Sequence, residues 1–295
     1  IYRVTNYFNF NPICGAGRFV YDISPRLDLN SFDLAVDAIK KAKSIFVGGN
    51  TTNNEAKFLA SLKNKFGVKL VNNILKQYKD FISIYYASGA RSATINDISN
   101  HKVIVSIGSS LKNENPLLRY KINNMLKLKK DSRFIYIHPL SDKLISKLSK
   151  NVTTINLAAN SDDVALLAIL NILDSNNSLL NVLEDSKINI NHKIVQDGEE
   201  KTLDVEYYDL YIKAKLDYET FLKLESNLVQ KPLIIIGSDL YAHPNAAYLA
   251  NILSVLQRDD KISVIFIPPT SNANGICNVI DFDDEIDGYR VGFRA

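Results

Sequence analysis

The 295-residue sequence is poor in cysteine, with Cys14 and Cys277 as its only two, and it contains no tryptophan. Two cysteines this far apart in unlike contexts exclude a disulfide-stapled fold and favour a reducing compartment, the cytosol. Cys277 lies in Gly275-Ile276-Cys277-Asn278, and we interpret it as a structural thiol. We attribute the lack of tryptophan to genome composition.

Long apolar runs are also missing. No run approaches the roughly 20 residues that a transmembrane helix needs, and no signal peptide is present. The sequence begins with Ile1, so we interpret it as a piece of a longer protein. Its 35 basic and 32 acidic residues give a net charge of +3, which is too mild to indicate nucleic-acid binding.

Histidines are few, and His101, His138, His192 and His243 show no metal-ligand spacing. The sequence has no nucleophile elbow and no Walker loop. His243 precedes a proline and is interpreted as a residue at the start of a helix. His138 follows an apolar run, where a side chain can face a ligand cleft at a strand end, which makes it a candidate functional residue.

What the sequence does contain is a repeated unit of a short apolar run, a glycine or proline, and an amphipathic helix. Continuously apolar strands that alternate with helices predict an α/β fold with parallel sheets covered on both faces. The expected strands are residues 44–48, 103–108, 133–138, 152–157, 233–237 and 262–267.

Local signals place several helices. Thr52 and Glu55 form a capping box, and Gly67 ends the helix that follows. A long helix is expected from Asp204 to Ser226, with an aromatic stripe that we assign to core packing. The polar stretch 176–201 lacks periodicity, and we expect a loop excursion there.

Six segments, in order, resemble the molybdopterin oxidoreductases and, among them, the large iron–sulfur subunit of NADH:quinone oxidoreductase (respiratory complex I). They are ICGAGRF (13–19), GGNTTNNEA (48–56), IGSS with a following ENP (107–110 and 114–116), IHP (137–139), NSDDVAL (160–166) and NANG (272–275). None of these segments is specific alone, whereas their order and spacing together indicate the family.

The resemblance implies two Rossmann-like domains of the formate dehydrogenase/DMSO reductase type, one inserted in the other. Residues 1–25 would end an iron–sulfur segment. Residues 26–80 and 202–295 would form the first, discontinuous domain, and residues 81–201 the second. We therefore expect the strands of 44–71 and 233–267 to share one sheet, and those of 103–157 to form another.

Cys14 is the residue that the resemblance marks as a metal ligand. In the resembling families this cysteine is the last of four ligands of a [4Fe–4S] cluster, and the other three lie upstream. We expect it to ligate a cluster only in the full-length protein, because one thiolate cannot hold a cluster. The alternative is a small buried thiol beside a tight turn at Gly15 and Gly17.

Catalytic members of the family bring a cysteine, selenocysteine or serine to molybdenum or tungsten from the stretch that corresponds to residues 82–91. That stretch contains no cysteine here, and its candidate ligands are Ser83 and Ser88. The family's Asp-Pro-Arg turn has become His138-Pro139-Leu140. These losses favour a relative that kept the fold without the cofactor, with its cleft narrowed or filled by side chains.

The leading hypothesis is therefore an electron-transferring subunit of the peripheral arm of complex I, without an active site or cofactor in this part. Other subunits of that arm would be its partners, and [4Fe–4S] and [2Fe–2S] clusters would belong to the full-length protein. The resemblance implies a peripheral location on the cytoplasmic side of the bacterial inner membrane. Two alternatives stay open: a molybdopterin enzyme such as a formate dehydrogenase or nitrate reductase, and an interaction scaffold with no redox role.

Overall fold

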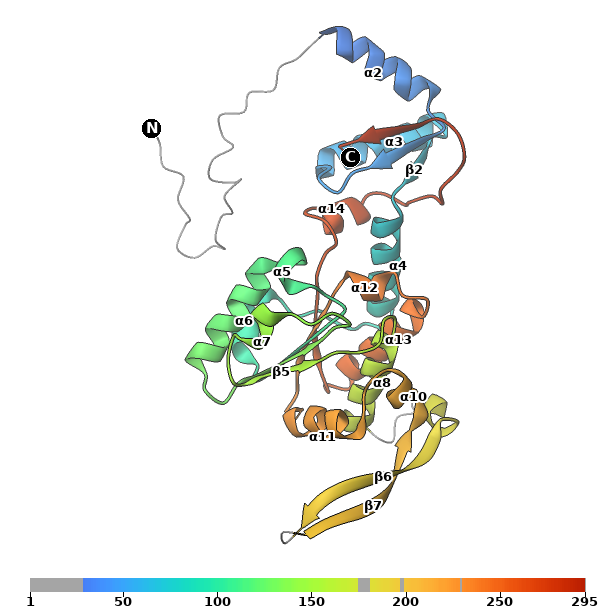
Figure 1. Cartoon of the computed structure of the whole chain (residues 1–295). Coiled ribbons are helices and arrows are strands. Elements are labelled where there is room, and N and C mark those ends of the chain that lie inside the picture. Colours follow the sequence, from blue (N-terminus) through green and yellow to red (C-terminus); the bar gives the residue numbers. More distant parts are fainter. Residues whose placement is uncertain (1–28, 175–180, 197–198, 229, 295) are drawn as a thin grey trace. The chain divides into compact units, whose positions relative to one another are not determined.

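The computed structural model describes residues 29–174, 181–196, 199–228 and 230–294. The chain divides into two compact units, one formed by residues 1–73 and 274–295 and the other by residues 74–273 (Figure 1). In the described part of the chain, no helix is both long and apolar enough to cross a membrane.

The first unit has a three-stranded parallel sheet in the order β10-β1-β2. Strand β1 (Ser44–Val47) lies in the middle, between β2 (Lys69–Val71) and β10 (Arg290–Phe293). The unit therefore joins an early and a late part of the sequence in one sheet. Helix α14 (Ala273–Cys277) precedes β10, and Cys277 is buried as expected of a structural thiol.

Two helices accompany this sheet. In α3 (Asn53–Phe66) the predicted capping box is confirmed, with the Thr52 hydroxyl accepting from the Glu55 amide and Glu55 accepting from the Thr52 amide. Gly67 ends α3 in the left-handed conformation, as predicted. Helix α2 (Leu29–Lys41) precedes β1, and its apolar residues are largely exposed, with Phe32 66% exposed.

The second unit contains a five-stranded sheet in which every pair is parallel, in the order β5-β4-β3-β8-β9. The strands are β3 (Val103–Ile107), β4 (Arg133–Ile137), β5 (Val152–Ile155), β8 (Leu233–Ile236) and β9 (Ser263–Phe266). The chain winds outward from β3 in one direction and, after a long excursion, from β8 in the other. The boundary between β3 and β8 is thus a topological switch point, where open α/β sheets hold their ligands.

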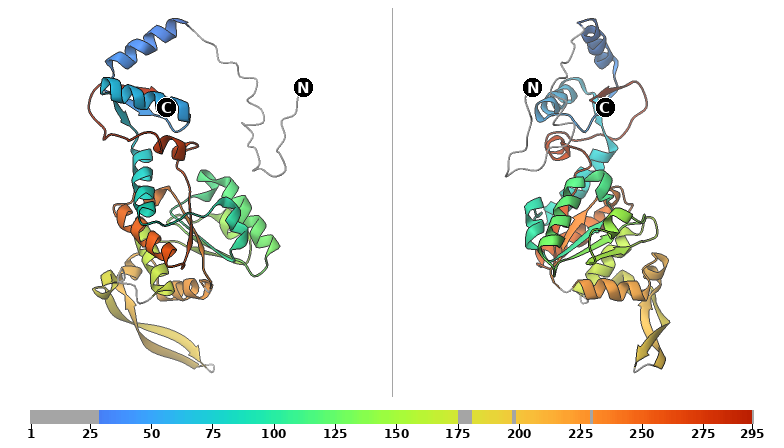
Figure 2. Two further views of the ribbon diagram at one scale, coloured as in Figure 1. Left: turned by 180° about the vertical axis from the view of Figure 1, so that it is seen from behind. Right: turned by 60° about the vertical axis from the view of Figure 1, so that its left-hand side comes forward.

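Helices cover both faces of this sheet, as the apolar strands predicted (Figures 1 and 2). On one face lie η1 (Ile95–Asn100), α5 (Leu111–Glu114), α6 (Pro116–Leu128) and α7 (Lys143–Ser146), whose buried residues share one cluster with Ile104, Phe134 and Ile235. On the other face lie α8 (Asp162–Leu173), α11 (Tyr218–Asn227) and α13 (Ala246–Arg258), and α8 contacts both of the others. Helices α4 (Asn73–Ala87) and α12 (Ser238–Tyr241) complete the unit, and the Tyr78 and Phe81 rings of α4 meet Tyr241 edge to face.

The predicted membership of the two sheets is wrong. We expected the strands of 233–267 to pair with those of 44–71, but β8 pairs with β3 and β9 with β8. The late strand that does join β1 is β10, which the sequence did not reveal, because Arg290–Phe293 is short and contains a glycine. Continuous apolarity marks a strand as buried on both faces but carries no information about which sheet buries it.

The predicted loop at 176–201 and helix at 204–226 are also wrong. Strands β6 (Lys187–Gln196) and β7 (Glu199–Tyr208) pair in an antiparallel ribbon that projects from the second unit (Figure 1). Helices α9 (Asn181–Glu184) and α10 (Asp209–Lys213) flank the ribbon. Its register puts Ile188, Ile190, Ile194, Leu203 and Val205 on one face, an alternation that the polar residues between them obscured.

The aromatic stripe has the packing role that we predicted, although on different elements. The Tyr207 ring, from the base of the ribbon, meets those of Tyr211, Tyr218 and Phe221 at centroid distances of 5.2 to 5.8 Å. Tyr207 and Tyr211 are fully buried. These rings anchor the ribbon to α10 and α11.

Candidate functional site

The carboxyl ends of β3, β4 and β8 bring polar residues together at one edge of the five-stranded sheet. Ser109 follows β3, His138 follows β4 and Asp239 follows β8. Because all five strands are parallel, their carboxyl ends meet at the same edge, which is where α/β sheets place their sites. Asp162 and His243 reach the same region from the starts of α8 and α13.

His138 is a buried ring in a defined hydrogen-bonding position. Its Nδ1 lies 3.0 Å from the Leu140 amide nitrogen and 3.2 Å from the Leu140 carbonyl oxygen, and its Nε2 lies 3.5 Å from an Asp239 carboxylate oxygen. The ring also stacks on Tyr136, with centroids 5.8 Å apart. Asp239 raises the pKa of His138 above 6.5, against the opposing effect of burial. His138 is therefore held as an ion-pair partner of Asp239.

Asp162 is the most unusual carboxyl group of this edge. It is 3% exposed, and its Oδ1 has no hydrogen-bond partner among the described residues. Burial raises the pKa of Asp162, and the negative charge of Asp239 adds to the effect. Its own position in the first turn of α8, where a helix favours negative charge, only partly offsets this cost.

His243 closes the edge on the α13 side. Its Nδ1 accepts from the Asn245 amide at 3.0 Å, so Nε2 carries the proton and donates to the Asn160 carbonyl at 3.3 Å. Asn245 also donates to Asp163 at 3.0 Å. These bonds join the starts of α8 and α13, and they agree with the prediction that His243 helps to begin a helix.

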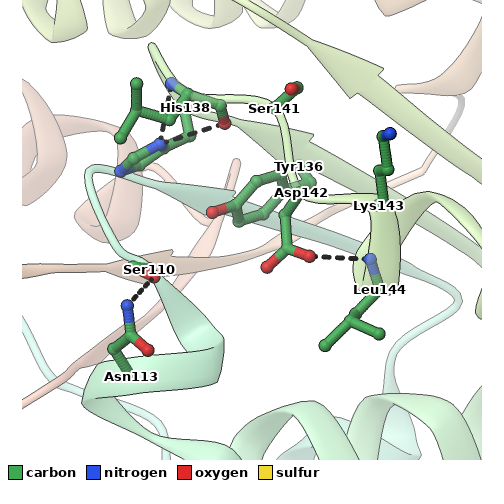
Figure 3. Close-up of a pocket in the computed structure, with 9 residues that line it drawn as sticks. Ser110, Asn113, Tyr136, His138, Ser141, Asp142, Lys143 and Leu144 are labelled. Carbon is green, nitrogen blue, oxygen red and sulfur yellow. Dashed lines mark hydrogen bonds between the residues drawn. The ribbon is translucent and has the colours of Figure 1, made fainter.

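An open pocket of about 360 Å³ lies beside His138 (Figure 3). Its lining is mainly polar: Ser110, Asn113, Tyr136, His138, Leu140, Ser141, Asp142, Lys143 and Leu144. Several polar groups are already engaged, since Asp142 caps α7 by accepting from Leu144 and Ile145, and Tyr136 donates to the Ser109 carbonyl. The pocket thus contains hydrogen-bonding groups and one lysine. Among the residues that line it, no serine or lysine forms a hydrogen bond with His138.

The two turn glycines at the switch point are packed against each other and against a leucine. Gly108 has a φ of +63°, and a Cβ there would come within 2.0 Å of Leu240 Cδ1. A Cβ at Gly237 would come within 2.1 Å of the Gly108 carbonyl oxygen. Glycine at such a turn can let a phosphate approach the backbone, but here the space at Gly108 holds the chain's own Leu240.

Ser83 and Ser88, which we considered as molybdenum ligands, do not lie on a loop that faces a site. Ser83 lies on α4 and is exposed, and Ser88 follows the end of α4, with its hydroxyl donating to the Tyr85 carbonyl at 3.1 Å. Residues 82–87 continue the helix that buries Phe81 and Tyr85, so this stretch does not form a ligand loop.

The remaining candidate residues lie apart from this edge. His101 bonds to the Asp97 carbonyl and to Ser263, and the His192 ring meets Tyr218. Cys14 lies outside the described residues. Among the residues that the structure does describe, no group of three or more His, Cys, Asp or Glu side chains could hold a metal ion. Asp162 and Asp239 were not singled out from the sequence, and only their position after a predicted strand could have indicated them.

Comparisons with known proteins agree with this architecture. The molybdopterin oxidoreductase family model matches residues 32–262, which is most of the chain. The chain belongs to the molybdopterin oxidoreductase family. No curated protein matches it. Family membership accounts for the α/β architecture and the parallel sheets. The match covers four of the six resembling segments, 48–56, 107–116, 137–139 and 160–166.

A solved structure shares the fold at a distance. The chain is similar to a chain of the formyltransferase/hydrolase complex from Methylorubrum extorquens, solved in complex with methylofuran, with 12% identity and a TM-score of 0.50. The match covers 82% of this chain and 59% of that one. The chain thus spans less than two thirds of the structure that it resembles, and at this identity the likeness shows the fold alone.

Proposed function

We propose that this chain is part of the large iron–sulfur subunit of NADH:quinone oxidoreductase, in which its two units form a scaffold without an active site of their own. The observation that carries the proposal is the contact between Leu240 and Gly108 at the switch point. A family member that uses a pterin dinucleotide needs this turn open, whereas a scaffold gains stability by filling it.

The segments that would hold the metal in catalytic family members support the same proposal. The stretch 82–91 contains no cysteine, its Ser83 is exposed on a helix, and the Asp-Pro-Arg turn reads His138-Pro139-Leu140. In the proposal, the edge of the sheet keeps its polar residues for structural reasons. His138 and Asp239 join two strand ends, and His243 and Asn245 join two helix starts.

In the assembled enzyme, electrons would pass through clusters held mostly by residues upstream of this sequence, with Cys14 as the last ligand of one [4Fe–4S] cluster. Four thiolates are required for such a cluster, so the upstream sequence must supply three. The partners would be other subunits of the peripheral arm, on the cytoplasmic side of the bacterial inner membrane. This part would hold neither molybdenum nor pterin.

The test is affinity purification of the full-length natural protein, tagged at its C-terminus, from its own cells. We expect it to elute with NADH:ferricyanide reductase activity and with iron, but without molybdenum, tungsten or pterin. A protein that elutes with stoichiometric molybdenum or tungsten and with formate or nitrate activity would instead be a molybdopterin enzyme. Elution with neither metal nor NADH oxidation would favour the scaffold without a redox role.

A further inference from the structure

The first unit carries an apolar groove that the fold itself does not fill. It has a volume of about 370 Å³ and is lined by residues of α2 and α3 and of the segments that follow them: Val36, Ile39, Lys40, Ala42, Phe58, Leu62, Phe66 and Val68. Phe58 is 55% exposed and Phe66 is 69% exposed. Large aromatic side chains gathered in one concave place, with half or more of their surface in water, are typical of a binding site.

The shape of the groove suits a helix. Phe58, Leu62 and Phe66 follow one another at intervals of four residues, so they form a single row along α3. The row is about 12 Å long, which matches about two turns of a partner helix. Val36 and Ile39 on α2 provide the opposite wall. A flat surface such as a membrane would touch the rims of this groove but not its floor.

The charge around the groove selects the partner. Lys57 and Lys65 each precede a lining phenylalanine, so they form an exposed basic row on the outer flank of the groove. Lys65 lies over the Phe66 ring, 5.4 Å from its centroid. Lys40 lines the groove itself, and the exposed Asp37, 3.5 Å from it, is its acidic neighbour. Exposed lysines beside an apolar floor favour an occupant with acidic flanks.

We propose that the groove between α2 and α3 binds an amphipathic helix of a protein partner, with apolar side chains on one stripe and acidic side chains beside it. Such a helix would place its apolar stripe on Phe58, Leu62 and Phe66, in the groove mode of helix recognition. Its acidic flank would pair with Lys57 and Lys65. The proposal goes beyond the proposed function and does not depend on it.

The experiment uses the whole 295-residue chain and two synthetic helical peptides with the same leucine stripe, one flanked by glutamate and the other by lysine. We expect fluorescence anisotropy to show tighter binding of the glutamate peptide by about tenfold, with a preference that shrinks at high salt. The variant K57E/K65E should reverse the preference. The control K127E/K130E, with the same charge change in the second unit, should leave it unchanged.

A second pair of variants tests the apolar floor. F58S/F66S should weaken both peptides by about tenfold, whereas L128S, which changes an 84% exposed leucine in the second unit, should weaken neither. Circular dichroism will show that each variant is folded. Equal binding of the two peptides by the unmodified chain, or binding of neither, would overturn the proposal.

Two other occupants would also overturn it. Sedimentation that shows a dimer of the chain, lost in F58S/F66S, would identify a second copy as the occupant. Co-sedimentation with phosphatidylserine vesicles that needs Phe58 and Phe66 would identify a lipid surface. None of these results depends on whether the chain purifies with NADH oxidation activity, so the groove and the proposed function can fail separately.

Discussion

Leu240 Cδ1 occupies the position that a side chain at Gly108 would need, 2.0 Å from the place of its Cβ. The backbone of Gly108 is in the left-handed region, with a φ of +63°, which disfavours residues that have a side chain. The contact with Leu240 leaves no room for such a side chain. Gly108 and Leu240 therefore determine the backbone conformation of the turn after β3 and the room for a side chain there.

The first prediction is that G108A destabilises the chain by about 2 to 4 kcal/mol, the sum of a left-handed alanine and an overlap with Leu240. Urea unfolding measures the change. The matched control is G89A, because Gly89 is also left-handed, with a φ of +82°, but meets nothing within 4 Å. It should cost only about 1 kcal/mol. A cost for G108A no larger than that of G89A would mean that the contact is not tight.

The double variant G108A/L240A refines this test. Removing the leucine side chain has its own cost, but it also removes the overlap, so the double variant should lose less stability than the two single variants together. Additive losses would show that Leu240 does not restrict Gly108. The same double variant, titrated with GDP by calorimetry, shows whether an opened turn accepts a nucleotide.

The second prediction concerns Asp162, whose burial raises the pKa of its carboxyl group above 3.8. A group that binds protons more tightly when folded stabilises the fold at low pH, and this stability is lost as the pH rises from its unfolded pKa through its folded one. Asparagine cannot ionise, so D162N should gain stability relative to the unmodified chain from about pH 4 upward. The gain should be complete once the pH lies above the folded pKa of Asp162.

Urea unfolding at a series of pH values measures this difference. D204N, which changes an exposed carboxyl group on β7, serves as the control and should leave the pH profile unchanged. If D162N loses stability at every pH, then the Asp162 carboxylate makes a stabilising interaction that asparagine cannot make. Our interpretation of this group would then be wrong.

The third prediction is that D239N lowers the pKa of His138. The hydrogen bond that His138 donates to the Asp239 carboxylate is the main cause of the raised pKa, and the opposing effect of burial stays when that bond is weakened. NMR titration of the imidazole measures the pKa directly. An unchanged His138 titration in D239N would show that the 3.5 Å contact is not an ion pair.

The pair of His138 and Asp239 also makes the free energy of unfolding depend on pH. Because the folded pKa of His138 lies above 6.5, its stabilising effect is complete below that pH and is lost as the pH rises through the folded pKa. D239N should therefore flatten the stability profile in that range. E219Q, an exposed change on α11, should not.

The fourth prediction concerns the anchor of the ribbon. Y207A should cost about 3 to 5 kcal/mol, because Tyr207 is 2% exposed and packs against four other rings. Y207F should cost about 1 kcal/mol, the value of the hydrogen bond from its hydroxyl to the Leu216 carbonyl. V195A, at a 74% exposed position of the same ribbon, should change stability by less than about 0.5 kcal/mol. Thermal unfolding compares the three, and equal effects of Y207A and V195A would contradict the anchoring role.

The sequence predicted those parts of the fold that local chemistry determines. Thr52, Glu55 and Gly67 specify the ends of α3 through hydrogen bonds and a left-handed turn, and both ends lie where the pattern placed them. The five strands of the second sheet were also located, because runs such as Leu233–Ile236 are apolar throughout. These signals involve residues close in sequence, so they can be read one segment at a time.

The parts that depend on distant residues were not predictable in this way. Strand β10 is recognisable only through its pairing with β1, and the ribbon only through the register that aligns Ile190 with Val205. At the site, His138 was selected because it follows a strand. Asp239 was missed, because its importance arises from the parallel pairing of β3 with both β4 and β8, which brings the ends of β4 and β8 to the same edge of the sheet.

The pairing of β1 with β10 has a consequence for synthesis on the ribosome. Ser44 pairs with Arg290, so the first sheet stays incomplete until residues 290–293 have been translated. The five strands of the second sheet all emerge earlier, by Phe266. The nascent chain can therefore form its second sheet while the first still exposes an unpaired edge of β1, the kind of edge that invites mispairing and the attention of chaperones.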